Sequence, residues 1–271
     1  MLFKYLPRER IDVLENLSIR FSPLLSLNDP FEQSPLIDMK VERKELQLDV
    51  ESEMKELINT ATEEEKTDEF YKLLQTTKDE LLRNIENKTN PSYVGKELIS
   101  LLGDNFGVLS LSRTEKSLLM WSHYAGEGKG LVLGLDDSHP FFKQRDLEGN
   151  ITRPLPITYS SNRRKVIPNE KQYYQKLLCE KPLEWAYEEE ERLFYSFGPD
   201  VKVVGKDDYD QKIILSALPK EAIKAVYIGY QTSKSDKERI LSAITKNNII
   251  CSQYFSSICN EEYKIVFKGV K

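Results

Sequence analysis

The chain has 271 residues, of which 39% are hydrophobic, 31% are charged and 10% are aromatic. Its mean hydropathy of −0.51 excludes a membrane-embedded protein, and its aromatic content argues against disorder. A net charge of −5 excludes a broad, sequence-independent nucleic-acid binder. Three scattered cysteines, Cys179, Cys251 and Cys259, do not form a disulfide framework. We therefore expect a globular, cytoplasmic protein without a membrane partner.

Residues 40–89 contain neither glycine nor proline. Their apolar residues recur at helical spacing in two stripes: Leu46, Val50, Met54, Leu57, Ile58 and Ala61, then Phe70, Leu73, Leu74, Leu81, Leu82 and Ile85. Thr60 or Thr62, followed by three glutamates, resembles a helix N-cap. Residues 42–88 hold 14 acidic and 8 basic side chains, a net charge of −6. We expect two or three amphipathic helices, then a helix at Tyr93–Leu102, making a helical insertion over residues 40–102.

From residue 106 onward, turn residues separate short runs rich in β-favouring residues. These runs predict strands at Gly107–Ser112, Gly130–Leu135, Ile157–Ser160, Glu191–Phe197, Ala225–Gly229 and Tyr263–Phe267. Helical patterns lie at Glu170–Lys181, at Lys212–Ala217 and at Ser235–Asn247, the last with Ser233 or Ser235 as N-cap. We expect one α+β domain over residues 1–271, with a mostly antiparallel sheet and the helical segment inserted after its first strand.

Several common site motifs are absent from the sequence. There is no phosphate-binding loop, and the glycines at 126, 128 and 130 precede a predicted strand instead of opening a helix. With two histidines, His123 and His139, and no closely spaced cysteines, no metal site is expected. A serine-hydrolase motif is also missing.

Residues 20–32 form the first candidate segment. Arg20 and Glu32 flank a turn-forming Asn-Asp-Pro sequence and are placed to hold a ligand at a strand end. The alternative is structural, with Asp29 capping a turn or helix.

Residues 109–125 form the second candidate segment. Ser110 and Ser112 share one face of a predicted strand. Trp121, His123 and Tyr124 follow, just before a glycine-rich turn, and their rings are typical of a wall that stacks on a flat ligand. Alternatively, Trp121 and Tyr124 anchor the core and His123 is a buried, hydrogen-bonded histidine.

Residues 181–193 form the third candidate segment, in which four consecutive glutamates lie between aromatic and apolar residues. In a strand, Glu188, Glu190 and Arg192 share one face. Paired carboxylates beside an arginine suit either a structural ion-pair ladder or a catalytic acid that its neighbours orient.

These segments together resemble the family called domain of unknown function 2971, which occurs mainly in bacteria. The resemblance covers most of the chain except residues 40–89. It rests on Phe3-Lys4-Tyr5, Phe21 to Glu32, Leu119 to Gly130 with Asp136, Trp185 to Arg192, and Ile223 to Gly229. Leu27 stands where an aromatic residue is usual.

The order of elements is also similar to that of ADP-ribosyltransferases, in which a first-strand residue grips NAD, a serine-containing strand follows, and a glutamate lies on a later strand. The resemblance implies NAD as substrate, with a carboxylate that binds the nicotinamide ribose and stabilises an oxocarbenium-like centre. It implies two catalytic residues, Glu188 and Glu190. It implies cofactor-binding residues at Lys4, Tyr5 or Arg20 on the first strand, and at Ser110 and Ser112 on the serine-containing strand. From the candidate segments we add Trp121, His123, Tyr124 and Arg192 to the expected cofactor-binding residues.

Two functions therefore remain open. The first is an NAD-consuming transferase or glycohydrolase, in a bacterial stress or phage-defence setting. The second is a non-catalytic module that binds a small nucleotide or a protein partner through residues 40–89, with Glu188, Glu190 and Arg192 as structural ion pairs.

Overall fold

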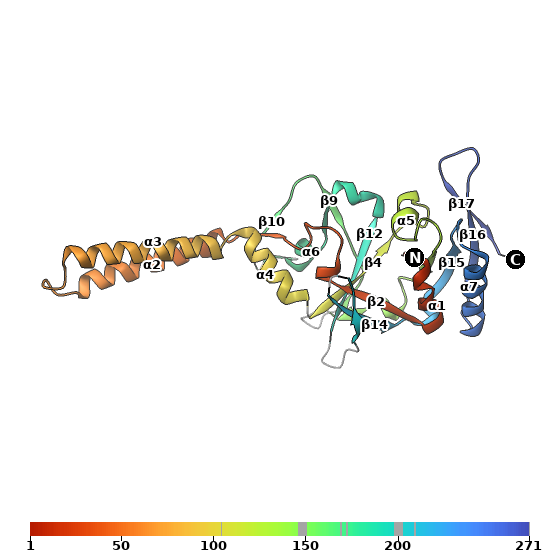
Figure 1. The fold of residues 1–271 in the computed structure, drawn as a ribbon, viewed down its shortest axis with the longest axis horizontal. Coiled ribbons are helices and arrows are strands. Elements are labelled where there is room, and N and C mark those ends of the chain that lie inside the picture. The colour runs from red at the N-terminus through yellow and green to blue at the C-terminus, as the bar shows by residue number, and fades with distance from the viewer. Residues whose placement is uncertain are drawn as a thin grey trace. The chain divides into compact units, whose positions relative to one another are not determined.

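The computed structural model describes residues 1–103, 105–145, 151–168, 170–171, 173–197, 203–208 and 210–270. The chain forms two compact units (Figure 1). The first comprises Met1–Asp29, Leu102–Asn162 and Cys179–Lys271, and the second comprises Pro30–Leu101 and Arg163–Leu178. The architecture is α+β with a mostly antiparallel open sheet, as predicted. The expected single domain with an insertion at 40–102 stays a prediction.

The first unit contains the main sheet, with strand order β13-β14-β2-β4-β1-β5-β15-β16-β17 and with β12 joined to β4 and β8. Its strands are β1 (Leu2–Leu6), β2 (Ser18–Pro23), β4 (Phe106–Ser112), β5 (Leu131–Leu135), β8 (Leu155–Pro156), β12 (Glu190–Ser196), β13 (Val203–Lys206), β14 (Lys212–Ala217), β15 (Ile223–Ile228), β16 (Ser252–Ile258) and β17 (Ile265–Gly269). Among the described pairs of this sheet, β15 and β16 run parallel, joined by helix α7 (Lys234–Lys246), and the rest are antiparallel.

Shorter elements complete the first unit. They are α1 (Asp12–Asn16), α5 (Leu118–His123), the 3₁₀ helices η1 (Arg8–Ile11), η2 (Leu24–Ser26), η3 (Pro140–Phe142), η4 (Leu183–Glu188) and η5 (Lys220–Ala222), and the strands β6 (Gln144–Arg145), β7 (Ile151–Thr152), β9 (Thr158–Ser160) and β11 (Glu180–Pro182). β9 and β11 pair in parallel and β6 pairs with β7.

Side-chain alternation along β1 divides the core of the first unit between the two faces of the sheet. Leu2 and Leu6 belong to one buried cluster, whereas Phe3 and Tyr5 belong to another. β5 lies beside β1 and is buried along its whole length, which explains its uninterrupted apolar sequence.

The second unit consists mainly of helices: α2 (Lys40–Thr60), α3 (Asp68–Lys88), most of α4 (Pro91–Gly103) and α6 (Tyr173–Leu178). A short parallel pair, β3 (Leu36–Ile37) with β10 (Lys165–Val166), accompanies them. The two long helices predicted by the glycine-free sequence are confirmed. The N-cap of α3 is Thr67, whose side chain accepts a hydrogen bond from the Phe70 N–H, whereas Thr62 bonds Glu65 within the connecting turn.

Two sequence-based elements are wrong. Residues 212–217 form strand β14 instead of a helical turn, because pairing with β2 buries Ile214. The helix expected at 170–181 is confined to α6, and Glu180–Pro182 instead pairs with β9. The six predicted strands and the helix at 235–247 are confirmed to within a few residues, with Ser233 as the N-cap of α7.

Gly130 occupies a position where the backbone of two segments meets. A Cβ atom at this residue would lie 2.0 Å from the Leu6 carbonyl oxygen, whereas nothing lies within 4 Å of a Cβ at Gly269. Gly130→Ala should therefore lower the free energy of unfolding by about 3 kcal/mol, and Gly269→Ala should change it by less than about 0.5 kcal/mol. Urea denaturation measures both, and equal stabilities of the two variants would contradict the close backbone approach at Gly130.

Candidate functional site

The candidate site lies where the main sheet divides along β4. Strand β12 pairs with the whole of β4 along one edge. The other edge is shared, because β2 pairs with β4 at Val108 and β1 pairs with it at Ser112. The strands β1 and β2 therefore diverge at Ser110, between the two registers, and leave a fork in the sheet.

The side chain of Lys4, in β1, hydrogen-bonds the backbone carbonyl of β4 that lies at this fork. The Arg113 N–H donates to the Glu189 carbonyl at 3.0 Å. In an antiparallel pair every second residue bonds the partner strand, so the odd-numbered residues of β4 bond β12. The backbone groups of Ser110 therefore point to the fork. The Lys4 Nζ donates to the Ser110 carbonyl oxygen at 2.9 Å. An ammonium group thus replaces the missing strand partner.

The surroundings of Lys4 disfavour its charged form. Lys4 keeps partial surface exposure because it borders a cavity, yet protein atoms surround its amine closely. Burial lowers the pKa of Lys4 to about 8. Glu190 opposes this shift, and the charges of Arg10 and Arg20 add to it.

Three buried charged side chains meet beside the fork. The Lys181 Nζ lies 2.7 Å from Glu188 Oε2 and 2.8 Å from Glu190 Oε2, and all three side chains are 4–5% exposed. Lys181 belongs to β11, Glu188 ends η4 and Glu190 begins β12. Between the two glutamates, Glu189 adopts the left-handed conformation, with φ of 43°. This reversal lets both carboxylates reach one ammonium group.

Arg192 balances the charge of this group. Its Nε donates to Glu190 Oε1 at 2.8 Å and its Nη2 donates to Oε2 at 3.1 Å, and its side chain is 1% exposed. Burial by itself raises the pKa of Glu190, but the charges of Arg192 and Lys181 outweigh burial and hold that pKa well below its usual range. We call Lys181, Glu188, Glu190 and Arg192 the buried charge cluster; its two cations and two anions compensate one another.

Tyr124 links the buried charge cluster to the cavity. Its hydroxyl donates to Glu188 Oε1 and accepts a hydrogen bond from Asn28 Nδ2 at 2.9 Å. Burial, and then the bond to the Glu188 carboxylate, raise the pKa of Tyr124, so the phenol stays protonated.

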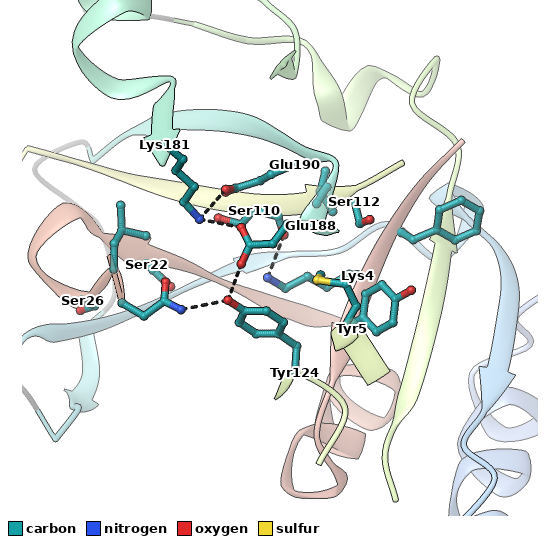
Figure 2. Close-up of a pocket in the computed structure, with 15 residues that line it drawn as sticks. Lys4, Tyr5, Ser22, Ser26, Ser110, Ser112, Tyr124, Lys181, Glu188 and Glu190 are labelled. Carbon is teal, nitrogen blue, oxygen red and sulfur yellow. Dashed lines mark hydrogen bonds and ion pairs between the residues drawn. The ribbon is translucent and has the colours of Figure 1, made fainter. Parts of the chain in front are cut away.

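These groups line a cavity of about 270 Å³ (Figure 2). In Figure 2, Lys181 reaches Glu188 and Glu190 from one side, Tyr124 reaches Glu188 from the other, and Lys4 extends to Ser110. Ionised carboxylates beside hydroxyl groups can accept hydrogen bonds from a polyhydroxylated ligand and stabilise positive charge on it.

Seven of the predicted site residues line this cavity: Lys4, Tyr5, Ser110, Ser112, Tyr124, Glu188 and Glu190. Ser110 pairs directly with Arg192, and Ser112 pairs with Glu190, so these four side chains share one face of the sheet. Glu188 is not on that strand, contrary to the prediction, because it ends η4. The binding and catalytic roles of all these residues stay predictions.

The prediction that Trp121 forms part of a ligand-stacking wall with His123 and Tyr124 is wrong. This indole is fully buried, its Nε1 donates to the Glu115 carbonyl at 2.7 Å, and its ring meets Tyr5 edge-on at 5.7 Å. Successive residues of a helix turn by about 100°. In α5 that rotation sends Trp121 into the core and leaves His123 exposed, away from the cavity lining.

The two predicted arginines lie outside the cavity lining. Arg20 forms an ion pair with Asp207 and bonds the Ser26 hydroxyl at 3.3 Å. Arg192 lies against Glu190 and orients that carboxylate without reaching the cavity wall.

Three residues that bond members of the site were not predicted from the sequence. Lys181 carries the central charge, Asn28 bonds Tyr124, and the Tyr159 hydroxyl accepts the Glu190 N–H at 2.8 Å. Asn28 belongs to the Asn-Asp-Pro sequence of the first candidate segment, which was interpreted only as a turn. Lys181 directly precedes the aromatic and acidic segment, but a single lysine gives no signal of burial. Tyr159 carries no signal in the sequence.

A comparison with known protein families gives a match over part of the chain. The family model of a protein of unknown function, DUF2971, matches residues 120–193, which include the end of α5, Lys181 and the glutamates of the buried charge cluster. No curated protein and no solved structure matches the chain. The resemblance to domain of unknown function 2971 is therefore supported over residues 120–193.

The described residues show neither a membrane-spanning helix nor a metal-binding group of side chains. None of their helices has the length and apolar character needed to cross a membrane. Their His, Cys, Asp and Glu side chains form no group of three or more that could hold a metal ion.

We expect Glu190 to stabilise the fold, because it pairs with both cations of the buried charge cluster. Glu190→Gln removes the anion that faces both Lys181 and Arg192, so the free energy of unfolding should fall by about 3–5 kcal/mol. Glu189→Gln, at the exposed neighbouring position, should change it by less than about 0.5 kcal/mol. Chemical denaturation measures the free energy of unfolding of both variants. Equal values for the two variants would mean that the cluster contributes no net stabilisation.

Lys4 should make stability depend on pH. Its pKa of about 8 in the folded state lies below the value of 10.5 for a free side chain. The unfolded chain therefore binds the extra proton between pH 8 and 10, so stability should rise with pH over this window. Above it, the raised pKa values of Tyr5 and Tyr124 lower stability again.

Lys4→Met should flatten this rise, whereas Lys116→Met, at an exposed position, should preserve it. Urea midpoints measured across the pH range provide the test. A wild-type protein whose stability stays constant from pH 8 to 10 would contradict the description of Lys4.

Proposed function

We propose that the cavity at the fork binds the nicotinamide-ribose half of NAD and that the protein is an NAD-consuming enzyme of the ADP-ribosyltransferase type. One observation carries the proposal. Residues from the first strand, from the serine-containing strand and from the glutamate segment line the same cavity, in the order that the resemblance implies. A cytoplasmic location and a stress or phage-defence setting remain predictions.

The reaction would break the bond between the ribose C1′ and the nicotinamide nitrogen. Nicotinamide leaves with the bonding electron pair, and positive charge develops on the ribose. Water or a nucleophilic side chain of an acceptor then bonds C1′ and releases a proton. The protein's contribution is electrostatic, because a carboxylate beside the ribose stabilises the developing charge.

Glu188 is the better candidate for contact with the ribose. Glu190 is bonded on both oxygens by buried cations, and displacing either would leave a buried charge unpaired. Glu188 Oε1 is bonded by the half-buried Tyr124, a neutral partner that a ribose hydroxyl can replace. In this proposal Glu188 is the catalytic residue, and Glu190 positions it through Lys181.

Lys4 and the serines would bind the rest of this half of the molecule. The Ser110 and Ser112 hydroxyls belong to the same cavity and can bond the carboxamide or the ribose. The buried charge cluster is neutral overall, so Lys4 gives the cavity a positive character when protonated. That character favours the anionic phosphate next to the ribose.

A second candidate, a non-catalytic binding module, is favoured by a different observation. Every oxygen of Glu188 and Glu190 already accepts a hydrogen bond or ion pair from the protein, as expected for a purely structural cluster. The partner surface would be helices α2 and α3. They expose the apolar side chains Val41, Leu46, Leu48, Leu57, Tyr71 and Leu73, and residues 42–88 have a net charge of −6.

Nicotinamide release from NAD distinguishes the two candidates. Glu188→Gln should reduce release about 100-fold while the variant stays folded, because Lys181 keeps Glu190 as its partner. Glu191→Gln is the matched control: Glu191 pairs with the exposed Arg113 and does not line the cavity, so its release rate should stay near that of wild type.

The assay is run with water as acceptor and with cell lysate, and melting temperatures are recorded for each variant. No release by wild type under either condition would reject the enzyme and leave the binding module. Equal release by wild type and Glu188→Gln would reject the role of Glu188.

A further inference from the structure

Four aromatic side chains form a continuous row beside the cavity. Trp185 and Tyr187 come from η4, and His123 and Tyr124 come from the end of α5. Ring centroids are 6.2 Å apart for Trp185 and Tyr187, 5.7 Å for Tyr187 and His123, and 6.4 Å for His123 and Tyr124. A hydrogen bond of 3.0 Å between His123 Nδ1 and the Tyr187 hydroxyl joins the two elements. We call Trp185, Tyr187 and His123 the aromatic rim.

The aromatic rim differs in exposure from the core aromatics of the same unit. Trp121, Phe3 and Tyr5 are buried. His123 is exposed, and Trp185 and Tyr187 are half-buried, so the rim keeps aromatic surface in contact with solvent. The ring planes of Trp185 and Tyr187 are inclined by 37°, whereas His123 meets Tyr187 nearly edge-on at 73°. A planar group can therefore stack on the face of Trp185 or Tyr187.

The aromatic rim borders the cavity at two points. Tyr124, which follows His123, lines the cavity and bonds Glu188. Lys181 also lines the cavity, and its Nζ lies 5.3 Å from the centroid of the Trp185 ring. A ligand that leaves the cavity past Tyr124 or Lys181 therefore meets the rim.

The size of the cavity requires such an extension. Its 270 Å³ lies below the roughly 300–1,000 Å³ of sites that enclose a drug-sized ligand. A dinucleotide whose nicotinamide-ribose half fills this cavity must place its other base outside it.

We infer that the aromatic rim stacks the adenine of the dinucleotide, an inference that rests on the proposed function. The charge of Lys181 is balanced by Glu188 and Glu190, so the rim offers aromatic surface instead of an unpaired cation. Such a surface favours a flat, uncharged base over a phosphate. Stacking on aromatic side chains accepts purine bases without a hydrogen-bond code, and adenine is the base that NAD supplies.

Tryptophan fluorescence tests this inference directly. The chain has two tryptophans, of which Trp121 is fully buried, so a stacked base quenches the emission of Trp185. The probes are AMP, NAD and nicotinamide mononucleotide, each titrated against the full chain. AMP and NAD should quench, and nicotinamide mononucleotide should bind, as measured by calorimetry, with little quenching.

Variants then assign the effect to the rim. Tyr187→Leu should raise the Kd of AMP and NAD about tenfold and change the Kd of nicotinamide mononucleotide less than twofold. Tyr187→Phe, which retains the ring, should restore most of the affinity. Tyr263→Leu is the control, because Tyr263 is fully exposed and lies between β16 and β17. If Tyr187→Leu does not fold, His123→Ala at the exposed end of the rim replaces it.

The outcomes test base stacking on the aromatic rim independently of NAD consumption. AMP quenching that Tyr187→Leu abolishes supports the rim even if wild type never releases nicotinamide. Absence of AMP binding, or equal weakening of AMP and nicotinamide mononucleotide in Tyr187→Leu, overturns the rim even if NAD is consumed.

Discussion

The site depends on a requirement of charge compensation among four buried side chains. Lys181 and Arg192 are compensated in the interior by Glu188 and Glu190, because an unpaired buried charge costs several kcal/mol. That requirement holds β11, η4 and β12 in one arrangement, since each contributes a member of the cluster. It also keeps the carboxylate of Glu190 ionised at the cavity wall.

The fork in the sheet supplies the space next to this cluster. A continuous sheet would have covered Ser110 with another strand, but β1 and β2 pair with β4 at different places and leave the position to Lys4. The same geometry removes water from the Lys4 amine and lowers its pKa to about 8. The cavity thus joins a weakly basic amine, two fixed carboxylates and four serines, a combination suited to a polar ligand with hydroxyl groups.

Stability and proposed function place different demands on the two glutamates. Glu190 is enclosed by cations, whereas Glu188 meets one cation and the neutral phenol of Tyr124. A structural role therefore fits Glu190 better, and ligand contact fits Glu188 better. The aromatic rim extends the same segment outward, because η4 carries both Glu188 and the rings of Trp185 and Tyr187.

Local sequence patterns predicted the α+β class, six of the strands, helices α2 and α3, and seven of the residues that line the cavity. These features follow from local periodicity and from side-chain types, which act over a few residues. Tertiary structure decided the rest. The strand at 212–217 forms because β2 pairs with it. Trp121 lies in the core because the rotation of α5 directs its side chain there. Lys181 becomes the centre of the charge cluster because glutamates on two other elements contact it. Pairing, burial and charge compensation are interactions between distant parts of the chain, and no local pattern encodes which distant residue will supply the partner.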